Sequence, residues 1–60
     1  MEFVLKKYIV KDNKTNRTFE AKHYGEISLD IVWQSVSNFF LIGSSVTITN
    51  ENGESKTFSK

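Results

Sequence analysis

Few residues of this 60-residue chain are of the types that carry out acid–base, nucleophilic or metal chemistry. The chain has one histidine, His23, and no cysteine. Glu20 is nearby in sequence, but residues three apart on a β-strand point to opposite faces, so this spacing builds no His–Glu pair. One imidazole without thiolates cannot assemble a zinc site. We therefore expect no catalytic residue, no metal site and no cofactor, and we interpret the chain as non-enzymatic.

A second group of residues has the composition of a nucleic-acid surface. If two N-terminal strands pair, one face is expected to carry Lys6, Tyr8, Lys22 and Tyr24. Cations interleaved with aromatic rings are typical of proteins that bind single strands. Glu20 falls on the same face, however, and the net charge is only +1, whereas such proteins usually have a larger basic excess. Two interpretations stay open: a small nucleic-acid-binding protein, or a solvated sheet face whose lysines protect an edge strand.

The first half of the chain predicts a β-hairpin. EFVLKKYIVK and RTFEAKHY are strand-like segments on either side of the turn formers DNKTN. If Ile9 and Phe19 share the core face, one register pairs Leu5 with His23 but sets Lys6 opposite Lys22. A register slipped by two residues avoids that clash. Both registers remain open.

Residues 28–43, SLDIVWQSVSNFFLIG, predict a helix. Ser28 is a good N-cap, Asp30 suits the first turn, and Gly43 is placed as the C-terminal stop. At helical spacing, one stripe faces the sheet: Leu29, Val32, Trp33, Val36, Phe39 and Phe40.

The C-terminal segment SVTITNENGESKTFSK predicts a second hairpin. A three-residue loop, 51–53, with Gly53 left-handed, pairs Val46 with Phe58 and Ile48 with Lys56 and so keeps one apolar face. The expected fold is α+β: a ββαββ domain over residues 1–60, with a small antiparallel sheet and one helix packed across it.

The outer side of the predicted helix has no charged residue between Asp30 and Gly43. Its expected residues are Ile31, Gln34, Ser35, Asn38, Leu41 and Ile42. Ile31 and Ile42 are expected on one helical face, with Asn38 between them. Interface cores are depleted in charge and contain apolar anchors, so these six residues are our candidate protein interface. The opposing interpretation is that both isoleucines are merely exposed, or covered by the N-terminal segment.

Size and charge indicate the kinds of partner. A chain this short buries only about 60% of its unfolded surface, and it lacks disulfides, so we expect self-association, most simply a homodimer. No segment reaches the length of a membrane span and no signal peptide is visible. We therefore expect a cytoplasmic protein without a membrane partner. Residues 1–24 carry a net charge of +3 and residues 25–60 a net charge of −2.

The size, the lack of Cys and Pro, and the order hairpin, SLDIVWQSVSNFFLIG helix, VTITNENGESKTF hairpin resemble small phage-encoded inhibitors of the antitoxin and anti-defence type. The resemblance covers the whole layout and no residue motif, so it implies no site residue. It implies a homodimer that binds and inhibits or modulates a host or defence protein in the host cytoplasm. The acidic DNA-mimicking inhibitors fit poorly, because the chain has 7 acidic against 8 basic residues.

Overall fold

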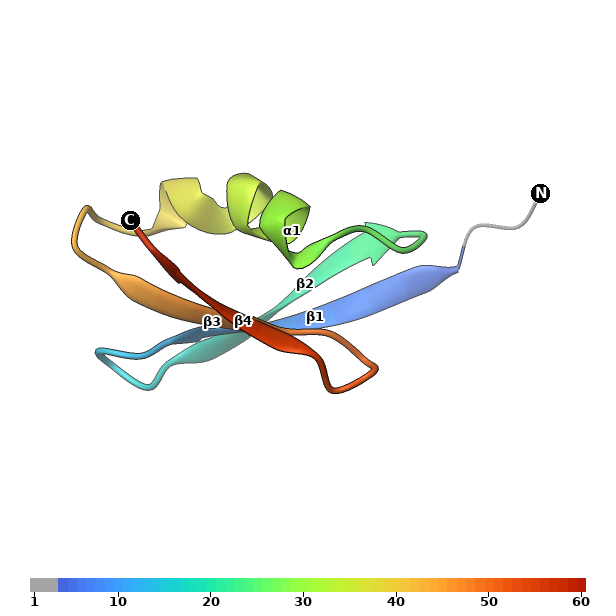
Figure 1. Cartoon of the computed structure of the whole chain (residues 1–60), viewed down its shortest axis with the longest axis horizontal. Coiled ribbons are helices and arrows are strands. Elements are labelled where there is room, and N and C mark those ends of the chain that lie inside the picture. The colour runs from blue at the N-terminus through green and yellow to red at the C-terminus, as the bar shows by residue number, and fades with distance from the viewer. Residues whose placement is uncertain (1–3) are drawn as a thin grey trace.

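Four strands form one antiparallel sheet, and a single helical segment lies across one of its faces (Figure 1). This arrangement comes from a computed structural model that describes residues 4–60. The elements are β1 (Leu5–Asp12), β2 (Thr18–Tyr24), α1 (Leu29–Val36), the 3₁₀ turn η1 (Ser37–Phe39), β3 (Ser45–Thr49) and β4 (Ser55–Ser59). The predicted α+β fold with ββαββ order is confirmed.

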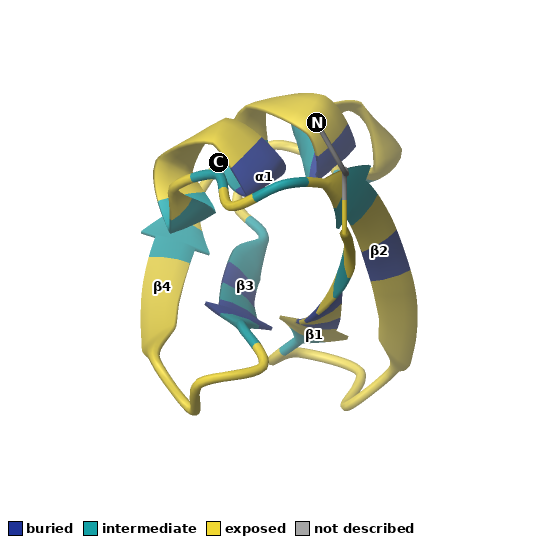
Figure 2. Ribbon diagram, turned by 90° about the vertical axis from the view of Figure 1, so that its right-hand side faces the viewer, coloured by how far each residue is buried: buried dark blue, intermediate teal, exposed yellow. Residues whose placement is uncertain are grey.

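The strand order is β2-β1-β3-β4, so the two hairpins lie side by side and β1 contacts β3. β2 and β3 both run antiparallel to β1 and flank it, which means that the helical connection between them must cross over β1. Figure 2 shows α1 spanning the sheet, with β4 at one edge and β2 at the other.

The first hairpin uses neither of the expected registers. Tyr8 pairs with Ala21 and Val10 with Phe19, while Ile9 lies opposite Glu20. The expectation that Ile9 and Phe19 share the core face was wrong. Tyr8 and Val10 face the helix and are buried, whereas Ile9 lies on the outer face of the sheet and is 42% exposed.

The second hairpin has the predicted register. Val46 pairs with Phe58 and Ile48 with Lys56. The loop is held by Asn50, whose side-chain oxygen accepts hydrogen bonds from the backbone N–H groups of Asn52 and Glu54. Gly53 has φ +85°, the left-handed conformation that favours glycine. The turn residues and the single apolar face therefore favour the same register in this hairpin.

The helix begins where predicted but ends earlier. Ser28 Oγ accepts a hydrogen bond from the N–H of Ile31 at 3.3 Å, as an N-cap does. Regular α-helix stops at Val36, the chain makes one 3₁₀ turn, and Phe40 is extended with φ −117° and ψ 149°. The predicted helix through residue 43 was wrong. Ser37 Oγ donates to the carbonyl of Gln34, and Ser and Asn side chains compete with helical backbone bonds in this way.

The core lies between the sheet and the helix. Its buried residues are Tyr8, Val10, Ala21, Val32, Val36, Val46 and Ile48. An aromatic stack closes one side, because the Trp33 ring lies 5.4 Å from the Phe58 ring and 5.9 Å from the Phe40 ring. Phe39, which was predicted to face the core, is 78% exposed, since it follows the end of regular α-helix.

Candidate binding surfaces

Three large apolar side chains stand almost fully in solvent where the helical segment gives way to the turn before β3. Phe39 is 78%, Leu41 83% and Ile42 90% exposed. We call these three residues the apolar tip. A shallow groove runs beside it, lined by residues 39–44 and by Asp12, Lys14 and Thr15 of the β1–β2 turn.

The backbone conformation explains why these side chains point outward. Phe40 is extended, and successive side chains of extended backbone point to opposite sides. Phe40 points inward and stacks on Phe19 and Trp33, so its neighbours Phe39 and Leu41 lie outside the core. The exposed Phe39 ring touches the rim of the stack, edge-on to Phe19 with 6.4 Å between the ring centres. The base of the tip is fastened to the C-terminus, because the N–H of Gly43 donates to the carbonyl of Lys60 at 2.7 Å.

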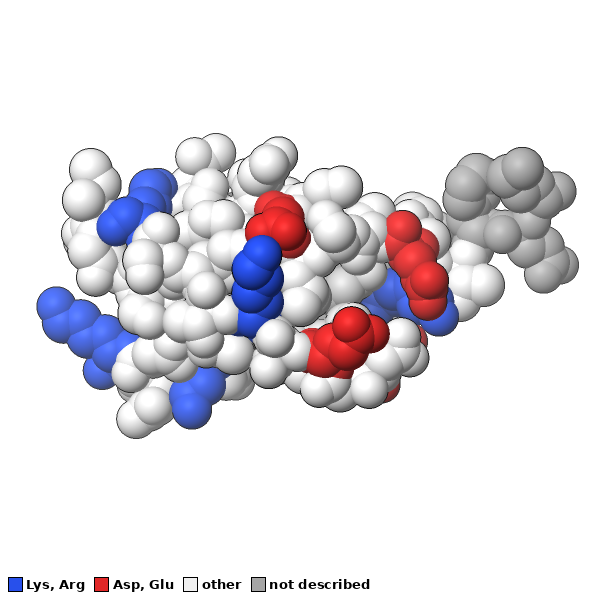
Figure 3. Space-filling view, viewed as in Figure 1, with Lys and Arg blue, Asp and Glu red and all other residues white. Residues whose placement is uncertain are grey.

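Two cations flank the apolar tip. Lys14 lines the groove, and Lys60 Nζ lies 2.6 Å from the carbonyl oxygen of Ser37. Figure 3 shows basic side chains gathered at this end of the molecule and acidic side chains mainly at the end of the β3–β4 turn, where Glu51 and Glu54 lie. Between the two ends, one ion pair joins Lys56 to Asp30. On this face, basic and acidic side chains are therefore separated along the length of the molecule.

The six predicted interface residues are all exposed, but they do not form one helical face. Four of them lie on the helical segment: Ile31, Gln34, Ser35 and Asn38. Leu41 and Ile42 belong to the apolar tip, beyond the helix. The predicted alignment of Ile31 with Ile42 was wrong because the α-helix ends at Val36. Both groups nevertheless lie on the helical layer of the molecule and carry no charge.

The four residues of the predicted nucleic-acid face are divided between the two faces of the sheet. Lys6 and Tyr8 lie on the helix side, whereas Lys22 and Tyr24 lie on the outer side. The observed register pairs Lys6 with His23, which moves the second strand by one residue relative to both expected pairings. A one-residue shift exchanges the faces of a strand. The expectation of one shared face was therefore wrong.

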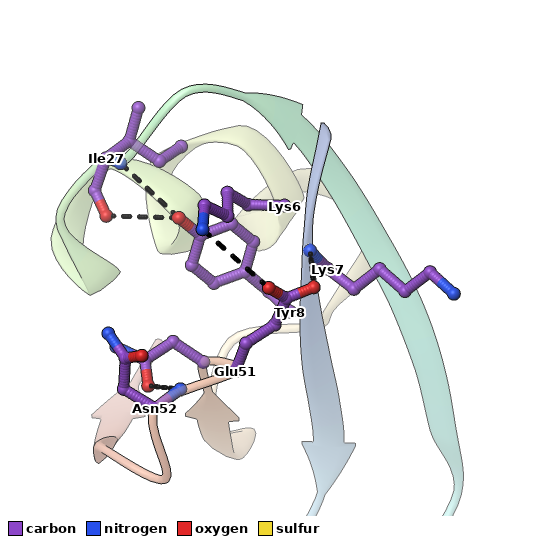
Figure 4. A network of polar contacts seen from close by, with 7 residues as sticks. Lys6, Lys7, Tyr8, Ile27, Glu51 and Asn52 are labelled. Atoms are coloured by element: carbon purple, nitrogen blue, oxygen red, sulfur yellow. Dashed lines mark hydrogen bonds and ion pairs between the residues drawn. The ribbon is translucent and has the colours of Figure 1, made fainter. Parts of the chain in front are cut away.

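Tyr8 has a structural position. It is 3% exposed, and its hydroxyl lies 3.3 Å from both the N–H and the carbonyl oxygen of Ile27 (Figure 4). The same figure shows Glu51 reaching β1: its carboxylate accepts the backbone N–H of Lys7 at 3.2 Å and lies 4.0 Å from Lys6 Nζ. These bonds join the β3–β4 turn and the segment before α1 to the central strand.

The outer face of the sheet carries a different set of cations and rings. Lys7 lies directly opposite Lys22, and Tyr24 near them is 70% exposed. This set could not be found from the sequence pattern, because it depends on the register of the first hairpin. The sequence does contain a second apolar face of β1, formed by Tyr8 and Val10. If that face is taken as the inward one, Lys7 lies on the outer face.

A polar row crosses the same outer face on the β4 side. Asn13 Nδ2 lies 3.0 Å from Thr47 Oγ1, which lies 3.0 Å from Thr57 Oγ1. Thr57 belongs to the edge strand β4, so the row ends at the open edge of the sheet.

His23 and Glu20 point to opposite faces, as the spacing predicts: His23 pairs with Lys6 and Glu20 with Ile9. His23 instead approaches Ser35 of α1, with Nε2 at 3.4 Å from Oγ. Ser35 Oγ also donates to the carbonyl of Val32 at 2.7 Å, the usual bond of a serine inside a helix. We assign this contact to the packing of α1 on β2.

Comparisons with protein-family models, with curated proteins and with solved structures find no match. Within residues 4–60, no group of three or more His, Asp or Glu side chains is placed to hold a metal ion. The helical segment in that range is too short to span a membrane. The exposed surfaces described above are the candidate functional sites of the molecule.

Proposed function

We propose that this chain is a non-enzymatic interaction protein that works as a homodimer and binds, and thereby inhibits or modulates, another protein. The observation that carries the proposal is the apolar tip. Three large apolar side chains in adjoining positions have between about three quarters and nine tenths of their surface in water. Exposed apolar patches of this kind are typical of interaction sites.

The tip has the properties of a binding anchor. Burying a Leu, Ile or Phe side chain is worth about 1.5–3 kcal/mol, so three of them supply the central contacts of an interface. Its base is tied to the C-terminus through Gly43 and Lys60 and to the aromatic stack through Phe40. A surface held in place before binding loses less conformational entropy on association. The exposed, uncharged residues of the helical segment, Ile31, Gln34, Ser35 and Asn38, extend the same contact region.

The partner that fits this surface is a protein with an apolar pocket bordered by carboxylates. Lys14 lines the groove beside the tip, Lys60 lies at the tip's base, and both supply the complementary charge. An anionic membrane is a poorer fit, because lipid-binding segments usually present a cluster of about four to eight Lys and Arg residues. The resemblance of the layout to small phage-encoded inhibitors favours a host or defence protein as the target.

A pair of substitutions in the tip tests the proposal. The double variant Leu41→Ser/Ile42→Ser is immobilised beside the unmodified chain and the control variant Ile9→Ser, and proteins retained from the source-cell extract are quantified. We expect one protein to be retained by the unmodified chain and by the control and to fall at least tenfold on the tip variant. Equal retention on all three would contradict the proposal.

The outer sheet face supports a second candidate function, binding of a single-stranded nucleic acid. The supporting observation is the direct opposition of Lys7 and Lys22 beside the exposed ring of Tyr24. Two like charges in register attract a shared anion, such as a phosphate, and an exposed ring offers a stacking surface.

A further inference from the structure

The edge strand β4 offers a surface for a second copy of the chain. We infer that two copies join through β4, antiparallel, with a two-fold axis through Thr57, to form one continuous eight-stranded sheet. The inference rests on the self-association proposed above and assigns the surface that mediates it. The dimer contact then lies at the sheet edge, and the apolar tip stays available for the target.

The backbone of β4 directs hydrogen-bonding groups to the open edge, where a further strand can pair. The N–H of Asn50 donates to the carbonyl of Glu54, and the N–H of Lys60 donates to that of Ser44. Because hydrogen-bonding direction alternates along an antiparallel strand, Glu54 to Lys60 alternate between facing β3 and facing outward. Ser55, Thr57 and Ser59 therefore direct their N–H and carbonyl groups to the open edge. No other element described in residues 4–60 lies beyond that edge (Figure 2).

The sequence ESKTFSK, residues 54–60, is complementary to itself in one register. With Thr57 opposite its own copy, Ser55 faces Ser59, Lys56 faces Phe58 and Glu54 faces Lys60. A shift by two residues in one direction places Lys56 opposite Lys56, and a shift in the other places Lys56 opposite Lys60. Like charges directly opposite each other destabilise a strand pair, so the register centred on Thr57 is favoured.

Two sets of side-chain contacts within one copy can be extended across the same two-fold axis. The polar row from Asn13 through Thr47 ends on Thr57, which would meet Thr57 of the second copy. On the helix side, Lys56 Nζ already lies 5.4 Å from the centre of its own Phe58 ring. The axis places the same pair of residue types opposite each other between copies. Asp30 lies 2.9 Å from Lys56 Nζ and offsets the charge that two Lys56 residues bring near the axis.

The charge distribution on the face seen in Figure 3 fits this two-fold arrangement. Basic side chains gather at one end of the face that includes β4 and acidic side chains mainly at the other (Figure 3). An axis perpendicular to the sheet reverses the second copy end for end. The basic end of each copy then lies beside the acidic end of the other, and Glu54 meets Lys60 twice. The two apolar tips lie at opposite ends of the dimer, free to bind two target molecules.

The other edge strand, β2, is less suited to self-pairing. It contains Glu20, Lys22 and His23 within seven residues, and His23 points inward. Charged side chains and inward-pointing ionisable groups are common protections of edge strands. On β4 the outward side chains are the uncharged Ser55, Thr57 and Ser59, and its one inward ionisable group, Lys56, is paired with Asp30.

Charge reversal tests the register. Glu54→Lys, Lys60→Glu and the double variant are compared with the unmodified chain by sedimentation over a wide concentration range, with circular dichroism as the check on folding. Each single variant places like charges opposite each other at both contacts between residues 54 and 60. We expect its dimer dissociation constant to rise about tenfold. The double variant restores both contacts, and its dissociation constant should return to within about threefold of the original value. Equal dissociation constants in all four chains would overturn the assigned register.

Cysteine cross-linking tests the surface. The chain has no cysteine, so Thr57→Cys introduces a single thiol at the proposed axis. Hydrogen-bonded residues opposite each other have Cα atoms about 5.5 Å apart, within the range of a disulfide. We expect rapid formation of a covalent dimer under mild oxidation, and no more than slow collisional coupling of the control Lys22→Cys. A dimer that does not cross-link at Thr57→Cys would overturn the β4 surface while leaving self-association intact, and a monomer at millimolar concentration would overturn both.

Discussion

Lys56 Nζ lies 2.9 Å from Asp30 Oδ1, and this ion pair joins the edge strand β4 to the first turn of α1. Asp30 also lies in the first turn of the helix, where a carboxylate is favoured by the helix dipole. One carboxylate thus serves both the helix start and the attachment of the helix to the sheet edge.

Removing the charge of Asp30 should therefore destabilise the fold slightly. Both side chains are more than half exposed, so solvent screens the pair and the expected loss for Asp30→Asn is about 0.5–1 kcal/mol. Urea unfolding at one fixed protein concentration measures it. In a double-mutant cycle with Lys56→Gln, the coupling energy should be positive but smaller than the whole effect of Asp30→Asn. A coupling of zero would assign the entire effect to the helix dipole.

Tyr8 is expected to matter for stability through its hydroxyl. That group bonds to both backbone groups of Ile27, which anchors the segment between β2 and α1 to the central strand. Tyr8→Phe keeps the ring but leaves those part-buried backbone groups without their partner, so the free energy of unfolding should fall by about 1–2 kcal/mol. The control is Tyr24→Phe, which removes the hydroxyl of an exposed tyrosine and should change stability by less than about 0.5 kcal/mol. Equal effects of the two substitutions would contradict the buried position of Tyr8.

The observed face of β1 can be checked with one pair of isoleucines. Ile48 is fully buried, whereas Ile9 is 42% exposed on the outer face. Ile48→Val should lower the free energy of unfolding by about 0.5–1.5 kcal/mol, and Ile9→Val should leave it nearly unchanged. Thermal unfolding of both variants under the same conditions measures the two losses of stability. A larger loss at Ile9 would mean that the sheet faces are exchanged.

The exposed position of Ile9 also shows why the register of the first hairpin was mispredicted. β1 carries apolar side chains on both faces, Leu5 and Ile9 on one and Tyr8 and Val10 on the other. Its alternation therefore does not identify the core face. Tertiary packing determines the core face, because Tyr8 and Val10 pack under α1 and the Tyr8 hydroxyl hydrogen-bonds to the backbone of Ile27. In the second hairpin, Val46, Ile48 and Phe58 give a single apolar face, and its register was predicted correctly.

The end of the helix was mispredicted for a related reason. The residues before Gly43 are apolar and continue a plausible helical stripe, so the pattern contains no break. The break arises from Ser37 and Asn38, which favour turns, and from the aromatic stack that draws Phe40 inward. As a result, two of the predicted interface residues, Leu41 and Ile42, were correctly expected to be exposed but were placed on the wrong element.

A gel shift at low salt tests the second candidate function. If the outer sheet face binds nucleic acid, a single-stranded oligonucleotide of mixed sequence should shift, and Lys7→Gln/Lys22→Gln should weaken the shift. The salt dependence of the double variant should also be shallower, because fewer counterions are released. Lys6→Gln, a change on the helix side of β1, is the matched control. The absence of any salt-sensitive shift with the unmodified chain would exclude this function.

The most direct test of the proposed function is site-specific photo-cross-linking from the apolar tip. A photoreactive phenylalanine analogue replaces Ile42, and in a control chain it replaces Ile9 on the outer face of the sheet. After irradiation in the source cells, we expect the chain labelled at position 42 to give a covalent adduct with one discrete protein, whose contact site is apolar and bordered by carboxylates. The control should not give this adduct. Adducts to lipid alone, or the same adducts from both positions, would contradict a protein-binding role for the tip.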